Sequence, residues 1–450
     1  MNPVPTDSLR IALERLFQRT AHGIRPGLEI ITQLLDALDH PERAYPYVHV
    51  AGTNGKGTVC AMVESVLRHT GYKTGLYTSP HLIRFNERIQ VDGQPATDSD
   101  LAALIEAIDP ITETVAAMPE GRPATFFEYA TAMAFEQFKR SAVDWAVIET
   151  GMGGRWDATN VGSPAISVIT RIDVDHVAYL GADIGKIAWE KAGIIKPGVP
   201  VVCGAFPDAV ECVVQDAART AGSVIIRADQ SVRIQRMHQD WSGQKVKVET
   251  EQRSLRPFRL PLVGRHQVEN CALAVAVLES LEAMGRIELP DAALRAGLAE
   301  VSWPARCQLL KRDPELILDV AHNPNGAAAL AHTLAEVGNG QPVGLVIGFL
   351  DDKDAKSCMD ALARVADRCW AVPIPHPRGM PPEEVRACAE RAGITAQTAS
   401  LAQALEEATA WAIAEHGMIC IAGSLYLAGE VLKGRAWVGR RKRSEGGHKS

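Results

Sequence analysis

Residues 48–58 constrain this chain more than any other part of its sequence. A short apolar run predicts a buried strand, a glycine-rich turn follows, and residues 59–69 have the apolar periodicity of a helix. In such a strand–loop–helix unit, free backbone N–H groups at the helix start can wrap phosphate oxygens. Lys56 would then reach the β- and γ-phosphates of a nucleotide, and the Thr58 hydroxyl would bind Mg²⁺.

The spacing of this loop departs from the common phosphate-loop pattern. In that pattern a Ser or Thr follows the lysine directly, whereas Gly57 stands between Lys56 and Thr58 here, and the upstream glycine spacing is shorter. A plain glycine-rich turn is therefore the alternative that this stretch leaves open.

Length and composition point to a soluble globular protein of two domains. A chain of 450 residues is too long for one core, and its 46 % hydrophobic and 22 % charged residues are ordinary for such a protein. The net charge of −7 argues against a protein built to hold nucleic acid. The one strong basic run, residues 440–443, lies in a tail, residues 440–450, that we expect to be disordered.

The cellular location follows from the cysteines and from the hydrophobic pattern. Nine cysteines are scattered without a C-x-x-C pair, which is typical of reduced thiols in the cytosol. The N-terminal segment lacks the apolar core of a signal peptide, and no run reaches the ~18 apolar residues of a membrane span. We therefore expect a cytoplasmic protein without a membrane partner.

Apolar strands alternate with helices through the first part of the chain. After the phosphate loop, strands are expected at residues 74–77, 145–149, 166–170 and 199–203, and helices at 98–107 and 125–139. Nearly continuous apolar strands of this kind predict a parallel sheet covered on both faces. Functional groups should then collect beyond the carboxyl ends of the strands, where Glu149 and His176 lie.

A change in pattern separates this series from a second one. Residues 224–260 alternate in polarity and predict a small antiparallel excursion, and helical periodicity returns at residues 267–284. Beyond residue 303 a second α/β series begins, with strands expected at residues 316–320, 343–348, 369–372 and 418–422. We predict an ATP-binding domain over residues 1–302 and a smaller α/β domain over residues 303–439, which lacks a phosphate loop and closes over the first.

Six motifs are spread over almost the whole chain. They are residues 52–58 (GTNGKGT), 78–82 (TSPHL), Glu149 with 153–160 (GGRWDATN), 173–176 (DVDH), 190–198 (EKAGIIKPG) and 319–324 (DVAHNP). Together, and in this order, they resemble the motifs of the folylpolyglutamate synthase and dihydrofolate synthase family within the Mur ligase superfamily.

The resemblance implies a Mur-ligase-like P-loop ATPase domain with a mainly parallel sheet, joined to a smaller Rossmann-like α/β domain. It also implies an ATP-dependent ligase that adds L-glutamate to dihydropteroate and to the γ-carboxylate of reduced folates. The γ-phosphoryl group of ATP would first activate the carboxylate as an acyl phosphate, which the amine then attacks. The family's usual form is a monomer.

The same resemblance implies a metal site, with two Mg²⁺ ions and a monovalent cation such as K⁺ as a further cofactor. The residues that match the family's ligands are Ser79, Glu149 and His176 for one Mg²⁺ and Thr58 for the other. A hydrogen-bonded loop histidine is the alternative role for His176. Glu149 closes a buried apolar strand, so its carboxylate requires a cation, a metal or a proton.

Lys191 matches a lysine that is carbamylated in related ligases, where it supports the second metal ion. Taken by itself, the pair Glu190–Lys191 would be the solvated face of a helix. Together with Lys56 and His176, Lys191 completes the catalytic set that the resemblance implies.

The family's nucleotide and glutamate contacts are carried over residue by residue. The expected ATP contacts are Asn54, Gly55, Lys56, Gly57, Thr58, Asn270, Arg306 and Asp319, and the expected glutamate contacts are His322 and Ser424. At the end of its strand, Asp319 is alternatively a simple helix cap.

Two segments resemble the dihydropteroate-binding parts of the family: Thr125, Phe126, Phe127 and Glu128 in one, and Trp156, Asp157 and Ala158 in the other. Aromatic rings beside a carboxylate suit a flat heterocycle that donates hydrogen bonds. Phe126 and Phe127 are alternatively core residues at a helix start. Trp156 stands where the family favours a smaller apolar side chain, so the pterin pocket of this chain is expected to differ in shape.

Other functions stay open at this point. The first segment favours a bifunctional enzyme, and a monofunctional dihydrofolate synthase or folylpolyglutamate synthase is the close alternative. A cell-wall Mur ligase usually carries an added N-terminal uridine-nucleotide domain, while about forty-seven residues precede the phosphate loop here. A P-loop nucleotide switch would leave Glu149, His176 and the second domain without a role.

Overall fold

The computed structural model describes residues 7–23, 25–175, 179 and 181–434. Within it the chain divides into two compact units, Met1–Pro304 and Ala305–Ser450. The expected basic tail and His176 both lie outside the described residues. Among the described helices, none is long and apolar enough to span a bilayer.

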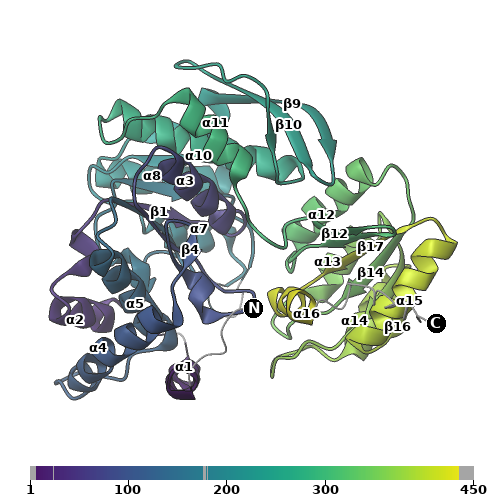
Figure 1. Cartoon of the computed structure of the whole chain (residues 1–450), viewed down its shortest axis with the longest axis horizontal. Coiled ribbons are helices and arrows are strands. Elements are labelled where there is room, and N and C mark those ends of the chain that lie inside the picture. Colours follow the sequence, from purple (N-terminus) through teal and green to yellow (C-terminus); the bar gives the residue numbers. More distant parts are fainter. Residues whose placement is uncertain (1–6, 24, 176–178, 180, 435–450) are drawn as a thin grey trace, which may run out of the picture. The chain divides into compact units, whose positions relative to one another are not determined.

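The first unit is built on an eight-stranded sheet (Figure 1). Its order is β4-β3-β2-β5-β1-β6-β7-β8, parallel except at β3 and β4. The strands are β1 (Tyr47–Ala51), β2 (Thr74–Tyr77), β3 (Ile89–Val91), β4 (Gln94–Pro95), β5 (Trp145–Glu149), β6 (Ile166–Ile169), β7 (Val201–Cys203) and β8 (Ile225–Arg227). The predicted parallel sheet is confirmed, and β1, β5 and β6 are buried along their whole length, as their apolar sequences require.

Helices cover both faces of this sheet. They are α1 (Asp7–Gln18), α2 (Glu29–Ala37), α3 (Lys56–His69), α4 (Asp98–Ala116), α5 (Phe126–Arg140), α7 (Ile184–Ala192), α8 (Asp208–Ala221), α9 (Ala228–Ser231), α10 (Arg265–Ala283) and α11 (Asp291–Glu300). One buried cluster joins the sheet to α3, α10 and α11, and a second joins it to α1, α2, α4 and α5. A third cluster lies beneath α7 and α8.

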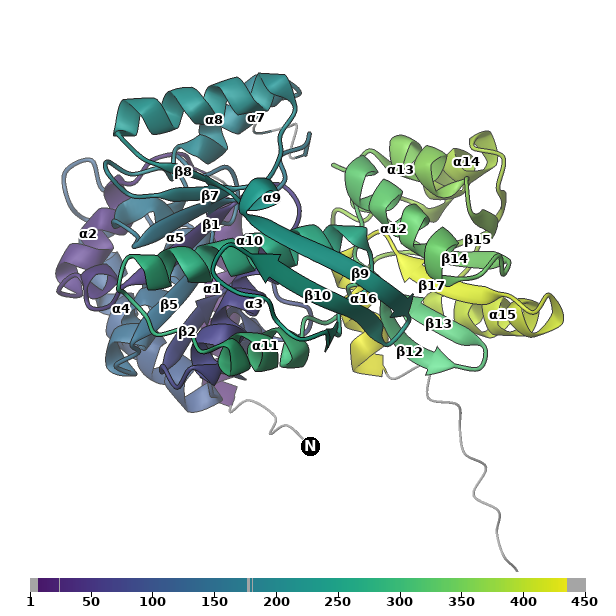
Figure 2. The same ribbon diagram turned by 90° about the horizontal axis from the view of Figure 1, so that it is seen from above.

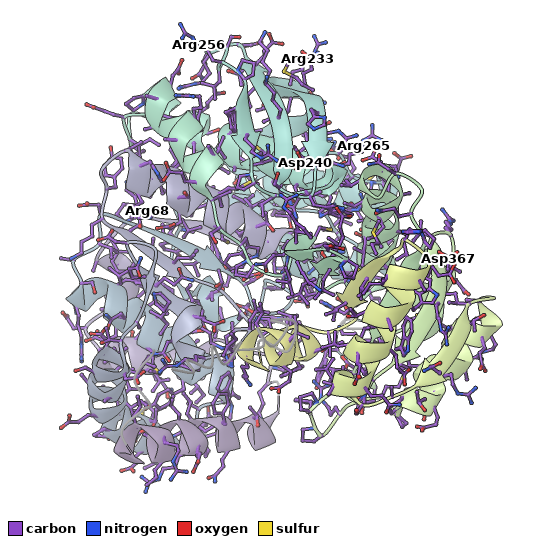
Figure 3. The ribbon with its side chains drawn as sticks, turned by 45° about the vertical axis from the view of Figure 1, so that its right-hand side comes forward. Arg68, Arg233, Asp240, Arg256, Arg265 and Asp367 are labelled. Atoms are coloured by element: carbon purple, nitrogen blue, oxygen red, sulfur yellow. The ribbon has the colours of Figure 1, made fainter. Side chains whose placement is uncertain are left out.

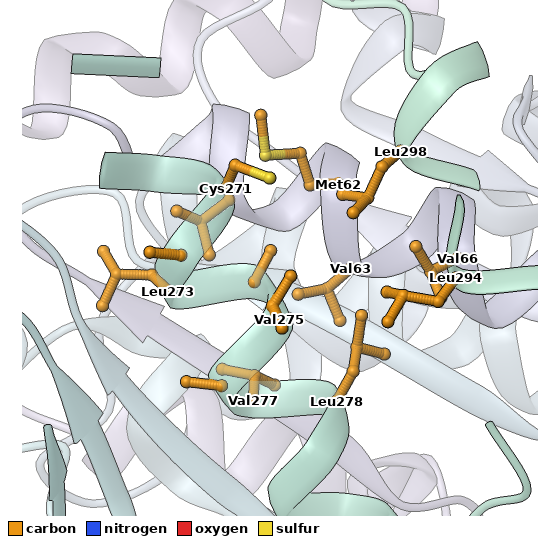
Figure 4. Packing of buried hydrophobic residues seen from close by; sticks show 14 of the residues in the cluster. Met62, Val63, Val66, Cys271, Leu273, Val275, Val277, Leu278, Leu294 and Leu298 are labelled. Carbon is orange, nitrogen blue, oxygen red and sulfur yellow. The ribbon is translucent and has the colours of Figure 1, made fainter. Parts of the chain in front are cut away.

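The cluster around α3 fixes the helix that carries the phosphate loop. Figure 4 shows Met62, Val63 and Val66 of α3 packed with residues of α10 and α11. A Cβ at Gly297 would lie 2.5 Å from the Val66 Cα, so only glycine allows α11 to approach α3 this closely. Burial of each large apolar side chain contributes roughly 1.5–3 kcal/mol to the free energy of folding. The packing therefore fixes α3, and with it the phosphate loop, against α10 and α11.

The predicted antiparallel excursion is also confirmed. It is a three-stranded sheet in the order β11-β10-β9, formed by β9 (Val232–Asp240), β10 (Gly243–Thr250) and β11 (Phe258–Leu260). Figure 2 shows β9 and β10 as a long ribbon beside α10. Its outer face is polar: Arg233 is exposed and Asp240 binds Arg259, and Figure 3 labels Arg233 and Asp240 among its charged side chains.

The second unit is a six-stranded sheet in the order β12-β13-β17-β14-β15-β16. Its strands are β12 (Gln308–Arg312), β13 (Glu315–Leu318), β14 (Val343–Ile347), β15 (Ala366–Ala371), β16 (Thr395–Thr398) and β17 (Met418–Ala422), and only β12 is antiparallel. Its helices are α12 (Pro324–Val337), α13 (Ala355–Leu362), α14 (Pro382–Arg391), α15 (Leu401–Ala414) and α16 (Leu425–Gly434). The expected smaller α/β unit is therefore present.

Several element boundaries differ from the sequence-based expectation. Helix α4 runs to Ala116 rather than ending near residue 107, with Pro110 inside it. Proline removes one backbone hydrogen bond, but Ile108, Thr112 and Val115 are buried on both sides of it, and their packing keeps the helix continuous. Helix α3 begins at Lys56, three residues earlier than expected, because Gly55 in the left-handed region turns the chain directly into the helix.

Candidate active site at the phosphate loop

The loop between β1 and α3 depends on glycines at two close approaches. Gly52 has φ +152°, and a Cβ there would lie 1.9 Å from Thr170 Oγ1. Gly55 has φ +92°, and a Cβ there would lie 2.4 Å from Asn270 Oδ1. Any larger residue at either position would push the loop off its support. The loop backbone therefore passes close to Thr170 and Asn270, and the free N–H groups at the start of α3 follow directly after the loop.

Residues after β6 hold this loop from the side. The Thr53 N–H donates to Arg171 O at 2.8 Å, and the Thr53 hydroxyl donates to Asp173 O at 2.8 Å. Thr170 Oγ1 donates to Asn54 O at 2.8 Å. Each bond uses the loop's own backbone or a short side chain, so the loop is rigid without bulky residues. The sequence did not lead us to predict that Thr170 and Arg171 hold the loop. Both residues directly follow an apolar strand, and this position at the carboxyl end of a strand is the feature that could have indicated their role.

Two lysines lie at the loop. Lys56 opens α3, and its Nζ lies 3.4 Å from Thr53 O and 4.0 Å from Glu149 Oε1. Lys191, on α7, is only 3 % exposed, and its Nζ donates to Gly52 O at 2.8 Å. Burial first, and then the positive charge of Lys56, lower the pKa of Lys191 to about 7 against the opposing effect of three nearby carboxylates. Lys191 is thus a buried amine at the loop and not the solvated helix residue that it resembles in isolation.

Two of the expected metal ligands, Glu149 and Ser79, are in contact with each other. Glu149 ends β5, and its Oε2 accepts a hydrogen bond from the Ser79 N–H at 2.9 Å. Thr58 is buried in the first turn of α3. His176 lies outside the described residues. Within the described part of the chain, no three His, Cys, Asp or Glu side chains form a group that could hold a metal ion by themselves.

Asn270 is brought to the loop by α10. Its Oδ1 is the atom that a Cβ at Gly55 would meet, and its Nδ2 donates to Gln267 Oε1 at 2.9 Å. Another neighbour is Trp303, whose ring lies 2.6 Å from the place where a Cβ at Gly57 would be. The expected nucleotide contacts of the first unit, from Asn54 to Thr58 together with Asn270, therefore gather at one loop.

The two phenylalanines of the first expected pterin segment lie in different surroundings. Phe126 stacks on Phe17 of α1, with ring centroids 5.4 Å apart at 17°, and the Arg88 guanidinium lies 5.1 Å from its ring centre. Phe127 lies against Tyr77 and fills the space that a Cβ at Gly151 would take, 2.5 Å away. Both rings are half-buried. A flat ring system therefore has aromatic surface available here.

Thr125 and Glu128 form the cap of α5. The Thr125 side chain accepts from the Glu128 N–H, and Glu128 Oε2 accepts from the Thr125 N–H at 2.8 Å. The same carboxylate binds both terminal nitrogens of Arg122 at 2.8 Å. Both oxygens of Glu128 are therefore already engaged, and a direct contact with pterin stays a prediction.

The second expected pterin segment contains one buried acid and one exposed indole. Asp157 accepts bonds from the Thr159 N–H and hydroxyl and from the Met152 N–H, and burial raises its pKa. Ala158 is buried, and Trp156 is 47 % exposed. Asp157 thus shapes the loop after β5, while the side chain of Trp156 stands out of the core.

Sequence reasoning missed the residues that surround Phe126. Phe17 comes from α1, and Arg88 donates from Nε to His81 Nδ1 at 2.8 Å while its guanidinium lies over Phe85 and Phe126. Phe17 is 39 % exposed at the end of an otherwise ordinary amphipathic helix. The sequence itself shows only an aromatic residue near the end of that helix, and nothing in it indicates a contact with Phe126.

In the second unit, the expected residues lie in loops after β13 and β17. Asp319 Oδ2 accepts from the Cys307 N–H at 2.8 Å and its Oδ1 from the Ala321 N–H at 2.7 Å, so it fixes the backbone next to Arg306. Asp319 does not cap α12, because Asn323 does so by accepting from the Gly326 N–H. The alternative role of Asp319 as a helix cap is therefore wrong.

The two expected glutamate contacts are on neighbouring loops of the same unit. The Gly423 N–H donates to Ala321 O at 3.0 Å, which joins the loop of His322 to that of Ser424. Ser424 is buried, and its Oγ accepts from the Tyr426 N–H at 3.1 Å. His322 Nδ1 lies 2.8 Å from Val320 O. The role of each in binding glutamate stays a prediction.

Comparisons with known proteins agree with this arrangement. The Mur ligase middle domain matches residues 50–278, and the Mur ligase, glutamate ligase domain matches residues 305–425. The chain is 38 % identical over 362 residues to the dihydrofolate synthase/folylpolyglutamate synthase of Bacillus subtilis, covering 80 % of this chain and 84 % of that one. It is 34 % identical over 422 residues to the Escherichia coli protein of the same name, covering 94 % and 93 %.

Solved structures give the same result. The folylpolyglutamate synthase of Mycobacterium tuberculosis complexed with ADP has a TM-score of 0.87 and 37 % identity, covering 96 % of this chain and 98 % of that one. Escherichia coli FolC in complex with DHPP and ADP has a TM-score of 0.84 and 32 % identity, covering 96 % and 99 %. The chain therefore belongs to the dihydrofolate synthase/folylpolyglutamate synthase family of Mur ligases.

Proposed function

We propose that this protein is an ATP-dependent ligase that adds L-glutamate to dihydropteroate and to the γ-carboxylate of reduced folates. The observation that carries the proposal is the loop of residues 52–58 with the two lysines, Lys56 and Lys191, at its backbone. The Lys56 cation and a row of helix N–H groups suit a triphosphate. Relatives named for both activities, and a relative complexed with ADP, support it.

The chemistry follows from the weakness of a carboxylate as an electrophile. Transfer of the γ-phosphoryl group of ATP onto the folate carboxylate gives an acyl phosphate, and the glutamate amine then attacks that carbonyl and expels phosphate. Asn54, Gly55, Gly57 and Asn270 would hold the phosphates through backbone and amide groups. Lys56 would balance the negative charge that develops on the transferred group. Arg306 and Asp319 are the ATP contacts proposed from the second unit.

The residues at the loop suit Mg²⁺. This ion prefers hard oxygen ligands, keeps several waters and binds substrate phosphates, so it does not require a cage of several carboxylates. Glu149, Ser79 and Thr58 supply such oxygens beside the loop, and His176 is the fourth ligand proposed from the family. Bound Mg²⁺ would neutralise phosphate charge and orient the γ-phosphoryl group. Two such ions, and a monovalent cation such as K⁺, belong to this proposal.

Lys191 is proposed to be carbamylated in the active enzyme. Carbamate formation requires an unprotonated amine, and the lowered pKa of about 7 supplies one near neutral pH. The modification would replace a buried cation by an anion next to the loop. Intact-mass measurement in bicarbonate buffer at high pH should detect an added carboxyl group on the wild type and none on Lys191→Ala. A fully active enzyme with an unmodified Lys191 would refute the modification.

The pteroyl group is proposed to bind at the rings of Phe126 and Phe127, with Asp157 and Ala158 shaping the adjacent loop. Thr125 and Glu128 position the two rings through the cap of α5. Trp156 is half-exposed and gives this chain an added aromatic surface at the same loop. His322 and Ser424 are proposed to contact the incoming glutamate. All nine cysteines are free thiols, which fits work in a reducing cytoplasm.

The proposal is tested by ADP release from Mg-ATP and L-glutamate, with dihydropteroate in one reaction and tetrahydrofolate in another. A bifunctional ligase releases ADP in both, and each product gains the mass of one glutamyl unit. Turnover in one reaction alone identifies a monofunctional enzyme. A nucleotide switch would release phosphate slowly without either acceptor. The absence of a glutamylated product in both reactions would refute the proposed function.

A further inference from the structure

A buried histidine stands in the strand that leads into the phosphate loop. His49, at the centre of β1, is fully buried between Ile148 of β5 and Ser167 of β6. It belongs to none of the nucleotide, metal or pteroyl contacts proposed for this chain. Its ring centroid lies 6.0 Å from that of Tyr47, whose ring in turn meets Phe135 of α5. His49 therefore faces the side of the sheet that α5 covers.

His49 begins a hydrogen-bond relay that ends at the loop after β5. Its Nε2 lies 2.8 Å from Thr159 Oγ1, and the Thr159 hydroxyl donates to Asp157 Oδ1 at 2.5 Å. The Thr159 N–H donates to the same oxygen at 3.1 Å, and the Met152 N–H donates to Asp157 Oδ2 at 2.9 Å. The relay of His49, Thr159 and Asp157 therefore joins the strand of the phosphate loop to the loop of residues 150–157.

The Thr159 hydroxyl fixes the direction of this relay. It has one proton, which it donates to Asp157, so its oxygen accepts from His49 and the ring proton of His49 is on Nε2. His49 Nδ1 then carries a lone pair, and among the described residues this buried atom has no hydrogen-bond partner. The opposite direction would leave a buried N–H at Nδ1 without an acceptor, which folded proteins rarely contain. His49 is therefore the donor, and the carboxylate of Asp157 is the final acceptor.

The charge states of the relay agree with this direction. Burial, and then the positive charge of Lys196, lower the pKa of His49 to about 3, so its ring is neutral near pH 7. Burial raises the pKa of Asp157, while the bonds donated by Thr159 and Met152 lower it and favour the ionised carboxylate. A leucine at position 49 would fill the site without an unpartnered nitrogen, so the hydrogen bond from Nε2 is what the histidine adds.

The loop that the relay holds lies against one ring of the proposed pteroyl pocket. A Cβ at Gly151 would lie 2.5 Å from Phe127 Cζ, so the backbone next to Met152 is in contact with this ring. Phe127 also lies against Tyr77, and it is half-buried. The loop and Tyr77 therefore set the position of the ring, and Asp157 in turn sets the position of the loop.

We propose that His49 is a positioning residue for the pteroyl substrate: through Thr159 and Asp157 it fixes the loop of residues 150–157 against the ring of Phe127. The inference rests on the proposed function, because it specifies what holds the pteroyl pocket of that ligase in shape. No bond is made or broken at His49, and it touches no substrate. Its loss should therefore weaken binding of the pteroyl substrate and leave the phosphate loop working.

Variants at position 49 test the hydrogen bond by steady-state kinetics, with dihydropteroate or tetrahydrofolate as the varied substrate, whichever the wild type uses. His49→Leu should raise the KM for this substrate about tenfold, because a loop shifted by a fraction of an ångström displaces the ring. The KM values for ATP and L-glutamate should stay within about twofold, and kcat within about threefold. His49→Gln keeps an N–H donor near the ε position and should recover most of the loss. His49→Asn is too short to reach Thr159 and should not.

A double-variant cycle tests whether His49 acts through Thr159. Thr159→Val replaces the hydroxyl by a methyl group and should also raise the KM for the pteroyl substrate about tenfold. The double variant His49→Leu with Thr159→Val should show about the same tenfold rise, and not a hundredfold one, because residues of one relay do not act independently. The double variant leaves no buried N–H of His49 without an acceptor, so it provides the measurement even if one single variant does not fold.

A matched control is Ser167→Ala. Ser167 is the register partner of His49 on β6 and is equally buried, and its hydroxyl donates to Ile194 O at 2.9 Å, outside the relay. The control loses one buried hydrogen bond from the same part of the sheet. It should lower the Tm and leave the KM for the pteroyl substrate within about twofold of the wild type.

The outcomes separate the positioning role from the proposed function. A wild type that ligates glutamate, with an unchanged pteroyl KM in His49→Leu and in Thr159→Val, overturns the positioning role alone. It is also overturned by equal losses in His49→Gln and His49→Asn, by a hundredfold rise in the double variant, or by a joint rise of all three KM values that Ser167→Ala shares. A wild type that glutamylates neither pteroyl substrate overturns the proposed function and the positioning role with it.

Discussion

The carboxyl edges of the two sheets in this protein are built in opposite ways. At the first, the backbone of the loop predominates: Gly52 and Gly55 let it pass close to its neighbours, and its own C=O groups accept the bonds from Lys56, Thr170 and Lys191. At the second, side chains predominate, with Asp319 accepting two backbone bonds and Ser424 standing on another loop. A site built from backbone groups suits a ligand that is the same in every catalytic cycle, such as the triphosphate of ATP. A site built from side chains can select among different amino-acid substrates.

This difference also explains what the sequence could predict. The loop of residues 52–58 could be identified from the sequence, because it is one contiguous motif whose glycines are required by local geometry. The strands β2, β5 and β17 were predicted with the correct bounds, since each is a short apolar run between polar residues.

Interactions between distant segments were not predictable. The stack of Phe17 on Phe126 joins residues 109 positions apart, and the hydrogen bond between His49 and Thr159 joins residues 110 positions apart. The engagement of Glu128 by Arg122 also depended on the path of the chain before α5. Periodicity and propensity carry no information about such contacts, because tertiary packing determines them.

The largest effect should come from a change in the backbone-built edge. In Gly52→Ala the added methyl group would meet Thr170 Oγ1, so the loop must move. We expect kcat/KM for ATP to fall at least about a hundredfold, since a shift near 1 Å in a phosphate site is that costly. The control is Gly71→Ala, because Gly71 also has a positive φ, +93°, but no atom lies within 4 Å of the place where its Cβ would be. Equal losses of activity in both variants would show that backbone strain, and not the close approach, is responsible.

A smaller effect is expected at the side-chain-built edge. In Asp319→Asn one acceptor oxygen becomes a donor that faces a backbone N–H, either that of Cys307 or that of Ala321. The chain next to Arg306 should shift, and we expect the KM for ATP to rise about tenfold. Asp367→Asn is the control, because Asp367 Oδ2 accepts from the Val343 N–H at 2.8 Å at the start of β14, away from this edge. If both variants lower the Tm but neither changes the KM for ATP, Asp319 has only a structural role.

The last effect is on stability and not on turnover, and it concerns Lys191, the buried side chain of the backbone-built edge. Its pKa is about 7 in the folded protein and about 10.4 when unfolded, so between these pH values the unfolded chain binds more protons and stability rises with pH. Lys191→Met lacks this titration. In buffers free of bicarbonate, metal and nucleotide, the variant should have the higher Tm at pH 7, and this advantage should shrink towards pH 10. A difference in Tm that does not change with pH would refute the buried, titrating amine.

The most direct test of the ligase mechanism is the fate of the oxygen atoms of the folate carboxylate. Dihydropteroate labelled with ¹⁸O in that carboxylate is incubated with Mg-ATP and L-glutamate, and the released phosphate is analysed by mass spectrometry. An acyl phosphate intermediate predicts that one labelled oxygen appears in inorganic phosphate for each glutamate joined. Label found in AMP, or phosphate that stays unlabelled while dihydrofolate forms, would contradict the account.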